Sequence, residues 1–264
     1  MDNDTALMCN AFKGMGAGFQ ATGKLDSAIW SFKKSIAYTE SIGNLSADVY
    51  YTKYNLSLGY FQNNNYDSSL FLLKEIGAYC KQTSNDELFI SVINLMGGIY
   101  QMGKNYNRAL EVYSEIEPIV EKSKNSYKKF IVYVCKAPLY SNIGKYSTSH
   151  EYYNKALEIV EEKISNDQYL ILMEMVLVHL EENDLLAAKE KVDTVLAHLD
   201  GITNFRRFNT IYGALAKYYQ STDNTSLAIE YATKYKPMSE VEAVEYDLLL
   251  YKIYKNIDKD KSFS

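Results

Sequence analysis

The three histidines are the residues of this chain whose type most readily supports metal or acid–base chemistry. His150, His179 and His198 lie far apart in the sequence. Histidines that bind one metal from a single helix recur at three or four residues, with a carboxylate nearby. No two of these histidines have that spacing. The sequence therefore predicts no metal site.

Two further groups of residues have compositions that could serve an enzyme. The segment Gly14–Gly18 is as dense in glycine as a phosphate-binding loop, but it lies inside a helical pattern, whereas a nucleotide-binding fingerprint follows a strand. The pairs Glu161–Glu162 and Glu181–Glu182 fall on faces expected to be solvated, and no second feature makes them acid and base. We therefore predict no catalytic residues and no cofactor, and expect that the protein is not an enzyme.

A polar break between two apolar segments recurs along the whole chain. It is clearest at 23–28, where one helical pattern ends and a second begins. The position at the end of this break, residue 28, has equivalents along the chain that follow one another at intervals of 41, 40, 40, 39 and 40 residues. A period this regular indicates a solenoid of stacked helix pairs. The aligned residues are Ala28, Ser69, Ala109, Ser149, Ala188 and Ala228.

Apolar residues within each repeat recur at three- and four-residue intervals, the period of an amphipathic helix. The chain is accordingly predicted to form thirteen helices and essentially no strand. A helix pair of this kind cannot bury its apolar face alone, so neighbours stack on it and present one long concave surface. Such a surface is typical of proteins that hold a peptide or another protein.

Composition excludes several classes of partner and compartment. The formal net charge of -5 offers no basic footprint for nucleic acid. Cys9, Cys80 and Cys135 are odd in number and widely spaced, which favours buried, reduced thiols. The acidic start lacks the features of a signal peptide, and the most apolar run, 169–180, is shorter than the roughly 20 residues that span a bilayer. We predict a cytoplasmic protein without membrane contact.

The order of aromatic and small residues in the repeats resembles the tetratricopeptide repeat. The resemblance covers nearly the whole chain, although the common period of that family is 34 residues and here it is about 40. Longer units of this kind are similar to those of kinesin light chains, of peptide-pheromone receptors and of the input regions of bacterial regulators. The matching residues are Phe12, Met15, Gly16, Phe19, Ala28 and Phe32 in the first repeat and Met96, Gly97, Tyr100, Ala109 and Tyr113 in the third.

The resemblance implies an all-α fold, a right-handed α-α superhelix of about six and a half helix-turn-helix repeats. We expect one domain over residues 1–264, with a last repeat that contains only a first helix at 240–256, a break at 257–261 and no second helix. An incomplete last repeat suggests a fragment of a longer protein. The expected repeats are 5–43, 46–83, 86–123, 126–164, 167–201 and 204–237, followed by the partial repeat 239–264.

The same resemblance implies that the first helix of each repeat lines the concave face. Asparagine amides there could pair with a peptide backbone, because an amide both donates and accepts hydrogen bonds. Aromatic side chains would offer rigid anchors. The candidate partner-binding residues are Asn10, Lys13, Gln20, Tyr51, Tyr54, Phe61, Asn94, Gln101 and Asn142, and the wider register adds Ala17, Leu58, Ser91, Val134, Leu170, Met173, Leu177, Thr210, Lys217 and Gln220.

Two hypotheses on function follow from this pattern. The first is a non-enzymatic protein- or peptide-binding scaffold, the sensory or docking domain of a bacterial multidomain regulator whose effector domain, DNA-binding or kinase, lies outside this segment. The alternative is a structural homo-oligomerisation module or adaptor, in which the apolar end at 247–254 mediates homodimerisation.

Overall fold

The structure, a computed structural model, describes residues 3–41, 43, 47–161, 167–199, 205–237 and 240–262 of the chain. Throughout these ranges the elements are helices joined by turns and short connections, and no strand occurs in them. The helices pack into two compact units, Met1–Lys124 and Asn125–Ser264. No helix among the described residues is long and apolar enough to cross a membrane.

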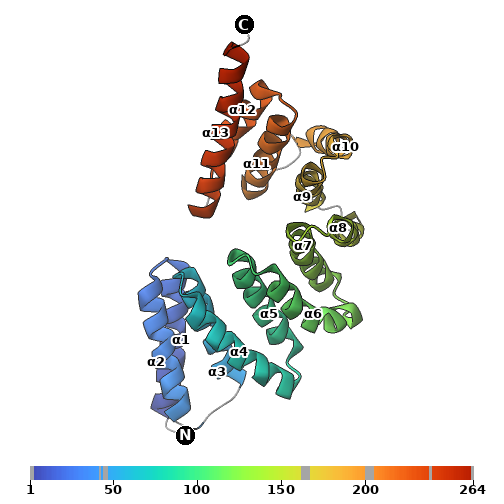
Figure 1. Cartoon of the computed structure of the whole chain (residues 1–264). Helices are drawn as coiled ribbons and strands as arrows, with labels where there is room; N and C mark the ends of the chain where they lie inside the picture. Colours follow the sequence, from blue (N-terminus) through green and yellow to red (C-terminus); the bar gives the residue numbers. More distant parts are fainter. Residues whose placement is uncertain are drawn as a thin grey trace. The chain divides into compact units, whose positions relative to one another are not determined.

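The first unit contains three helix pairs, in which each helix packs against the next along the chain. Figure 1 shows the first pair in blue, with its two helices side by side. Phe32 on the second helix is fully buried and packs with Val49 and Leu56 of the third. The helices are α1 (Asn3–Ala21), α2 (Leu25–Ser41), α3 (Ala47–Gln62), α4 (Tyr66–Thr83), α5 (Asp86–Met102) and α6 (Tyr106–Lys122).

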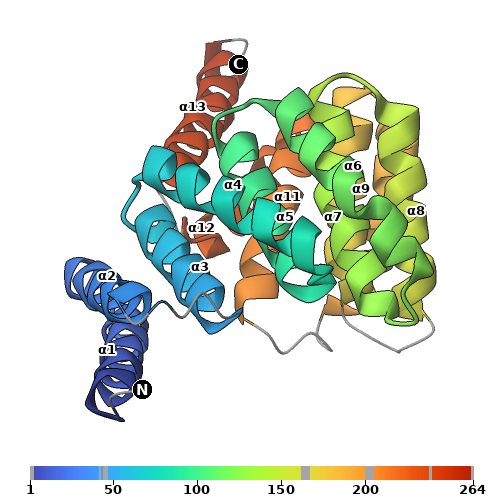
Figure 2. The ribbon, with the colours of Figure 1, turned by 90° about the horizontal axis from the view of Figure 1, so that it is seen from below.

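The second unit contains three further pairs and a last single helix. Its first helices also contact one another, α9 with α11 and α11 with α13, and Figure 2 shows α7 and α8 side by side. Fully buried Met173, Ile211 and Leu215 form its core together with Leu249 and Ile253 of the last helix. The helices are α7 (Ser126–Asn142), α8 (Tyr146–Glu161), α9 (Asp167–Glu181), α10 (Leu185–Leu196), α11 (Phe205–Ser221), α12 (Thr225–Lys234) and α13 (Glu240–Ser262).

The turn inside each pair has the same backbone conformation. One residue with a positive φ ends the first helix, and these residues recur at steps of 41, 40, 40, 39 and 40, the spacing found in the sequence. Glycine adopts this left-handed conformation freely, and asparagine and aspartate tolerate it better than most other residues. The six residues are Gly23, Asn64, Lys104, Gly144, Asn183 and Asp223.

The residue after this turn position caps the second helix of the pair in three of the repeats. The Asn65 side chain accepts a hydrogen bond from the Ser68 amide at 3.2 Å, and Asp184 accepts one from the Ala187 amide at 3.0 Å. Asn224 makes the same contact in the sixth repeat. A side-chain oxygen at this place satisfies one of the free amides of the first turn. Two adjacent short polar residues therefore serve two different purposes, the turn and the cap.

The last helix corrects one expectation. A break was predicted at 257–261, but α13 continues without interruption to Ser262. The six real turns each contain a residue with positive φ, whereas the described residues of α13 contain none. The run 257–261 contains no glycine and no proline, the two residues that disfavour a helix most. The division into one domain of repeats stays a prediction.

The three cysteines differ in exposure. Cys80 is buried, whereas Cys9 and Cys135 are half-buried. The expectation of three buried thiols is therefore wrong for two of them, because the helix faces that carry Cys9 and Cys135 are only partly covered.

Candidate functional site

The nine candidate residues from the sequence all lie on first helices. Eight belong to the first unit and one to the second, and no hydrogen bond, ion pair or ring contact joins two of the nine side chains within the described ranges. By helix they are Asn10, Lys13 and Gln20 on α1; Tyr51, Tyr54 and Phe61 on α3; Asn94 and Gln101 on α5; and Asn142 on α7.

Two candidates on α1 are bound to the neighbouring first helix. The Lys13 Nζ lies 3.3 Å from the Asp48 Oδ1 on α3, and the Gln20 Nε2 donates to the Gln62 Oε1 at 2.8 Å. These contacts link the first helices of the first two repeats. Both contacts are exposed, so a bound partner could replace them with contacts of its own at little cost in free energy. Asn10 is exposed on the same helix.

The aromatic candidates on α3 are only partly accessible. Tyr51 is 40% exposed, whereas Tyr54 is half-buried, and burial raises the pKa of its hydroxyl. Phe61 is half-buried, with its ring centroid 6.0 Å from that of Tyr66. Tyr51 is thus the most accessible aromatic group of the three.

Among the amide candidates, Asn94 has an unused acceptor. Its Oδ1 is buried and has no hydrogen-bond partner among the described residues. A buried acceptor without a partner costs about 1–3 kcal/mol, so its presence calls for an explanation. Asn142, in contrast, donates from Nδ2 to the Pro138 carbonyl of its own helix at 2.7 Å, and Gln101 is half-buried.

The second unit has a cleft along its first helices. Two adjoining cavities of about 410 and 450 Å³ share Leu177, Lys217, Glu245 and Leu249. Both lie within the size range of binding sites for small ligands. The lining comes from α9, α11 and α13, with Tyr235 from the segment after α12. Leu177, Thr210, Lys217 and Gln220 of the wider sequence register lie in this lining.

Charged groups sit over the apolar floor of this cleft. Burial raises the pKa of Glu174, while Lys217 and the hydrogen bond from Tyr153 oppose that rise. The Lys217 Nζ lies 3.6 Å from the Glu245 Oε2. Burial also raises the pKa of Tyr153, and the charges of Glu174 and Glu181 raise it further. The cleft can therefore accept both an apolar side chain and polar groups of either sign.

A segment after α12 forms one wall of the cleft because Asn209 holds it. The Asn209 Nδ2 donates to the Lys236 carbonyl at 2.8 Å, and its Oδ1 accepts from the Lys236 amide at 2.6 Å. Asn209 is 5% exposed. This pair of hydrogen bonds keeps Tyr235 against Gly213, where a Cβ would lie 3.2 Å from the ring.

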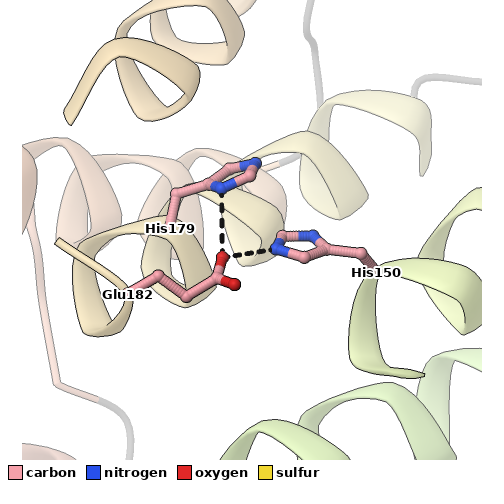
Figure 3. A group of neighbouring side chains, drawn as sticks. All are labelled: His150, His179 and Glu182. Carbon is pink, nitrogen blue, oxygen red and sulfur yellow. Dashed lines mark hydrogen bonds and ion pairs between the residues drawn. The ribbon is translucent and has the colours of Figure 1, made fainter. Parts of the chain in front are cut away.

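Sequence reasoning missed a cluster of two histidines and a glutamate. His150 on α8 and His179 on α9 lie with their ring centroids 4.2 Å apart, and both approach the Glu182 carboxylate (Figure 3). The sequence places these histidines far apart, and the fold brings this pair together. In the repeat register Ile29 takes the place of His150 and Tyr60 that of His179, and Ile29 lies beside Gly59, the residue before Tyr60.

Comparisons with known proteins identify the fold. No protein-family model matches the sequence, and no curated protein matches it. A tetratricopeptide repeat protein from Parabacteroides merdae is 15% identical with a TM-score of 0.66, over 97% of this chain and 93% of that chain. The apo form of RapI is 13% identical with a TM-score of 0.71, and the match covers 94% of this chain and 76% of that chain. NprR in complex with its cognate peptide NprX is 16% identical with a TM-score of 0.60, and the match covers 94% of this chain and 75% of that chain.

At such identities the likeness is one of fold. The three structures confirm the all-α, tetratricopeptide-like solenoid that the sequence predicted.

Proposed function

We propose that this chain, which has the fold of tetratricopeptide-like repeat proteins, is a non-enzymatic scaffold that binds a peptide or an extended segment of a partner protein. The observation that carries this proposal is the cleft of the second unit, which is lined by three successive first helices. Stacked repeats use this face for binding in general, because it is long and continuous.

The groups in the cleft favour a peptide over a purely apolar ligand. Carboxyl groups of Glu174, Glu181 and Glu245 and the ammonium groups of Lys217 and Lys252 surround an apolar floor formed by leucines. A peptide matches such a lining, because it carries polar groups beside apolar side chains. The partner we expect is therefore a segment with an apolar side chain next to polar ones.

The first unit carries a separate candidate for peptide binding. The Asn94 Oδ1, which is buried and has no hydrogen-bond partner among the described residues, can accept a hydrogen bond from a peptide amide. Tyr51 offers an exposed aromatic surface on the preceding first helix, α3. The remaining candidates on α1, α3, α5 and α7 stay part of this proposal.

The structure of NprR with its cognate peptide supports this class of partner, since a chain of similar fold binds a peptide. We extend the proposal to a sensory or docking domain of a bacterial multidomain regulator that acts in the cytoplasm. An effector domain, DNA-binding or kinase, would then lie outside this segment.

Selection from a random-peptide phage library against the wild-type chain tests the proposal. Synthetic copies of enriched peptides are titrated against the wild type, Lys217→Ala and Asn94→Ala by fluorescence anisotropy. Loss of a contact at a binding hot spot should weaken affinity by about 10-fold. Lys145→Ala, an exposed lysine in the turn before α8, is the matched control and should bind as the wild type does. Peptides that bind all four proteins equally would contradict the proposed site.

A second function, self-association, is favoured by the exposed face of α13. Leu249 and Ile253 are buried against the unit, but Val244, Leu248 and Tyr251 are 70%, 54% and 61% exposed. Their spacing of four and three residues forms one apolar stripe on the helix. A second copy of the chain could cover this stripe with the same surface, as in a two-fold dimer.

Analytical ultracentrifugation over a range of concentrations decides between the two functions. If α13 mediates a dimer, the wild type should show a concentration-dependent mass and Leu248→Glu should be monomeric. Leu186→Glu on α10, where the leucine is 83% exposed, is the control. A wild type that is monomeric at every concentration rules the dimer out and leaves the peptide-binding function standing.

A further inference from the structure

The cluster of His150, His179 and Glu182 connects two neighbouring repeats. His150 lies on the second helix of the fourth repeat, His179 lies on the first helix of the fifth, and Glu182 directly follows that helix. The His150 Nε2 is 2.7 Å from the Glu182 Oε2, and the His179 Nδ1 is 3.3 Å from the same oxygen (Figure 3). The three ligand atoms all lie within 4.8 Å of one another.

The hydrogen bonds inside the cluster leave two polar atoms unsatisfied. The Nδ1 atoms of His150 and His179 are buried and have no hydrogen-bond partner among the described residues. The His179 Nδ1 is near the carboxylate, but the contact does not have the geometry of a hydrogen bond. Buried ring nitrogens without partners are unfavourable, so the cluster is poorly explained as an ordinary hydrogen-bonded network.

We propose that His150, His179 and Glu182 bind a divalent transition-metal ion of the zinc class. Two imidazole nitrogens and one carboxylate oxygen form a donor set that zinc accepts, and three protein ligands leave a fourth position for water or another ligand. The ion would be bound by the His150 Nε2, the His179 Nδ1 and the Glu182 carboxylate, and would thus satisfy one of the two ring nitrogens, the His179 Nδ1.

The separations in the cluster are close to those that a tetrahedral ion requires. Bonds of about 2.0–2.1 Å at the tetrahedral angle place two ligand atoms about 3.3 Å apart. The distance from the His179 Nδ1 to the Glu182 Oε2 is already 3.3 Å. The distance from the His150 Nε2, 2.7 Å, would lengthen when the ion replaces the shared proton. Side-chain rotation is enough for this, because Glu182 is 29% exposed.

The cluster has charged neighbours of both signs. Glu182 and Asp184 are the acidic neighbours of His179, and His150 and Lys191 are the basic ones. The Asp184 side chain is engaged as the cap of α10, so its charge contributes without acting as a ligand. An ion at this place would link α8 to α9 and thereby the fourth repeat to the fifth.

Isothermal titration of the tag-free, chelator-treated chain with Zn²⁺ tests the site. We expect one ion per chain in the wild type. Loss of an outer-shell partner of a metal costs 10–100-fold in affinity, so His150→Gln and His179→Gln, which each remove a ligand, should weaken binding by about 100-fold or more. His198→Gln is the matched control, since the exposed His198 bonds to the Thr194 carbonyl of its own segment and stacks on Tyr169. Far-UV circular dichroism checks that each variant folds.

Imidazole NMR signals of the unmodified protein give an answer that needs no variant. The chain has only three histidines, so each ring can be followed by itself. Zn²⁺ should shift the signals of His150 and His179 and leave those of His198 in place. Absence of binding, binding that shifts no histidine signal, or equal affinity of the two ligand variants and the wild type would each overturn the proposal.

Discussion

Gly97 on α5 lies directly against the ring of Tyr113 on α6. A Cβ on residue 97 would overlap the Cε2 and Cζ atoms of that ring, and Tyr113 is 1% exposed. The neighbouring Gly98 has nothing within 4 Å of its would-be Cβ. Packing against Tyr113 therefore requires glycine at position 97, whereas packing places no such requirement on position 98.

We expect Gly97→Ala to destabilise the protein by about 1–3 kcal/mol, because the added methyl group must displace a buried ring. Gly98→Ala is the control and should stabilise by about 0.5–1 kcal/mol through helix propensity. Urea unfolding measures both. Equal effects of the two variants would contradict the close contact.

Asn209→Ala should destabilise the second unit. It removes both hydrogen bonds to the Lys236 backbone and leaves that amide and carbonyl without their buried partner, at a cost of about 1–3 kcal/mol. Asn154→Ala, at an exposed position of α8, should stay within about 0.5 kcal/mol of the wild type. Thermal unfolding compares the two, and similar melting temperatures would show that Asn209 does not hold the segment.

The buried carboxyl of Glu174 should make stability depend on pH. Burial raises its folded-state pKa above the unfolded value of about 4.3, so the folded chain retains a proton that the unfolded chain releases. Stability is therefore lost as pH rises from the unfolded pKa to the folded one. Glu174→Gln should abolish this loss, so the variant should be more stable than the wild type at pH 7 but not at pH 4.

Urea unfolding at both pH values measures this difference, with Glu158→Gln on the exposed face of α8 as the control. A gain in stability that is the same at pH 4 and at pH 7 would argue against titration of Glu174. Lys217 and the Tyr153 hydrogen bond act in the opposite direction, so the effect is the net result of burial and these two partners.

The thiols should react at different rates. Burial raises the pKa of Cys80 to about 11, and the side chain is 2% exposed. At pH 8, Cys80 is then a thiolate in only about one in a thousand molecules. Iodoacetamide should therefore modify half-buried Cys9 before Cys80, as followed by mass spectrometry of the native protein. Modification of Cys80 at the rate of Cys9 would contradict its burial.

The sequence by itself determined the helix pairs and their spacing. Turn residues such as Gly23 and Asn64 act locally, because a left-handed conformation depends on the residue type at that position. Gly16 was readable from the repeat pattern, which places a small residue there, and the structure gives the reason: an added Cβ would lie 2.6 Å from Phe32 on the next helix. The break predicted near the end of α13 was wrong, since polarity alone does not end a helix.

Only the tertiary structure decided which distant side chains meet. Among the described residues the Asn94 Oδ1 has no hydrogen-bond partner, and Glu174 lies near Lys217 in the cleft; both follow from how successive helices pack and not from any local motif. His150 and His179 are 29 residues apart and come together because a second helix packs on the next first helix. Contacts between helices depend on packing angle and side-chain rotamers, which a repeat period does not specify.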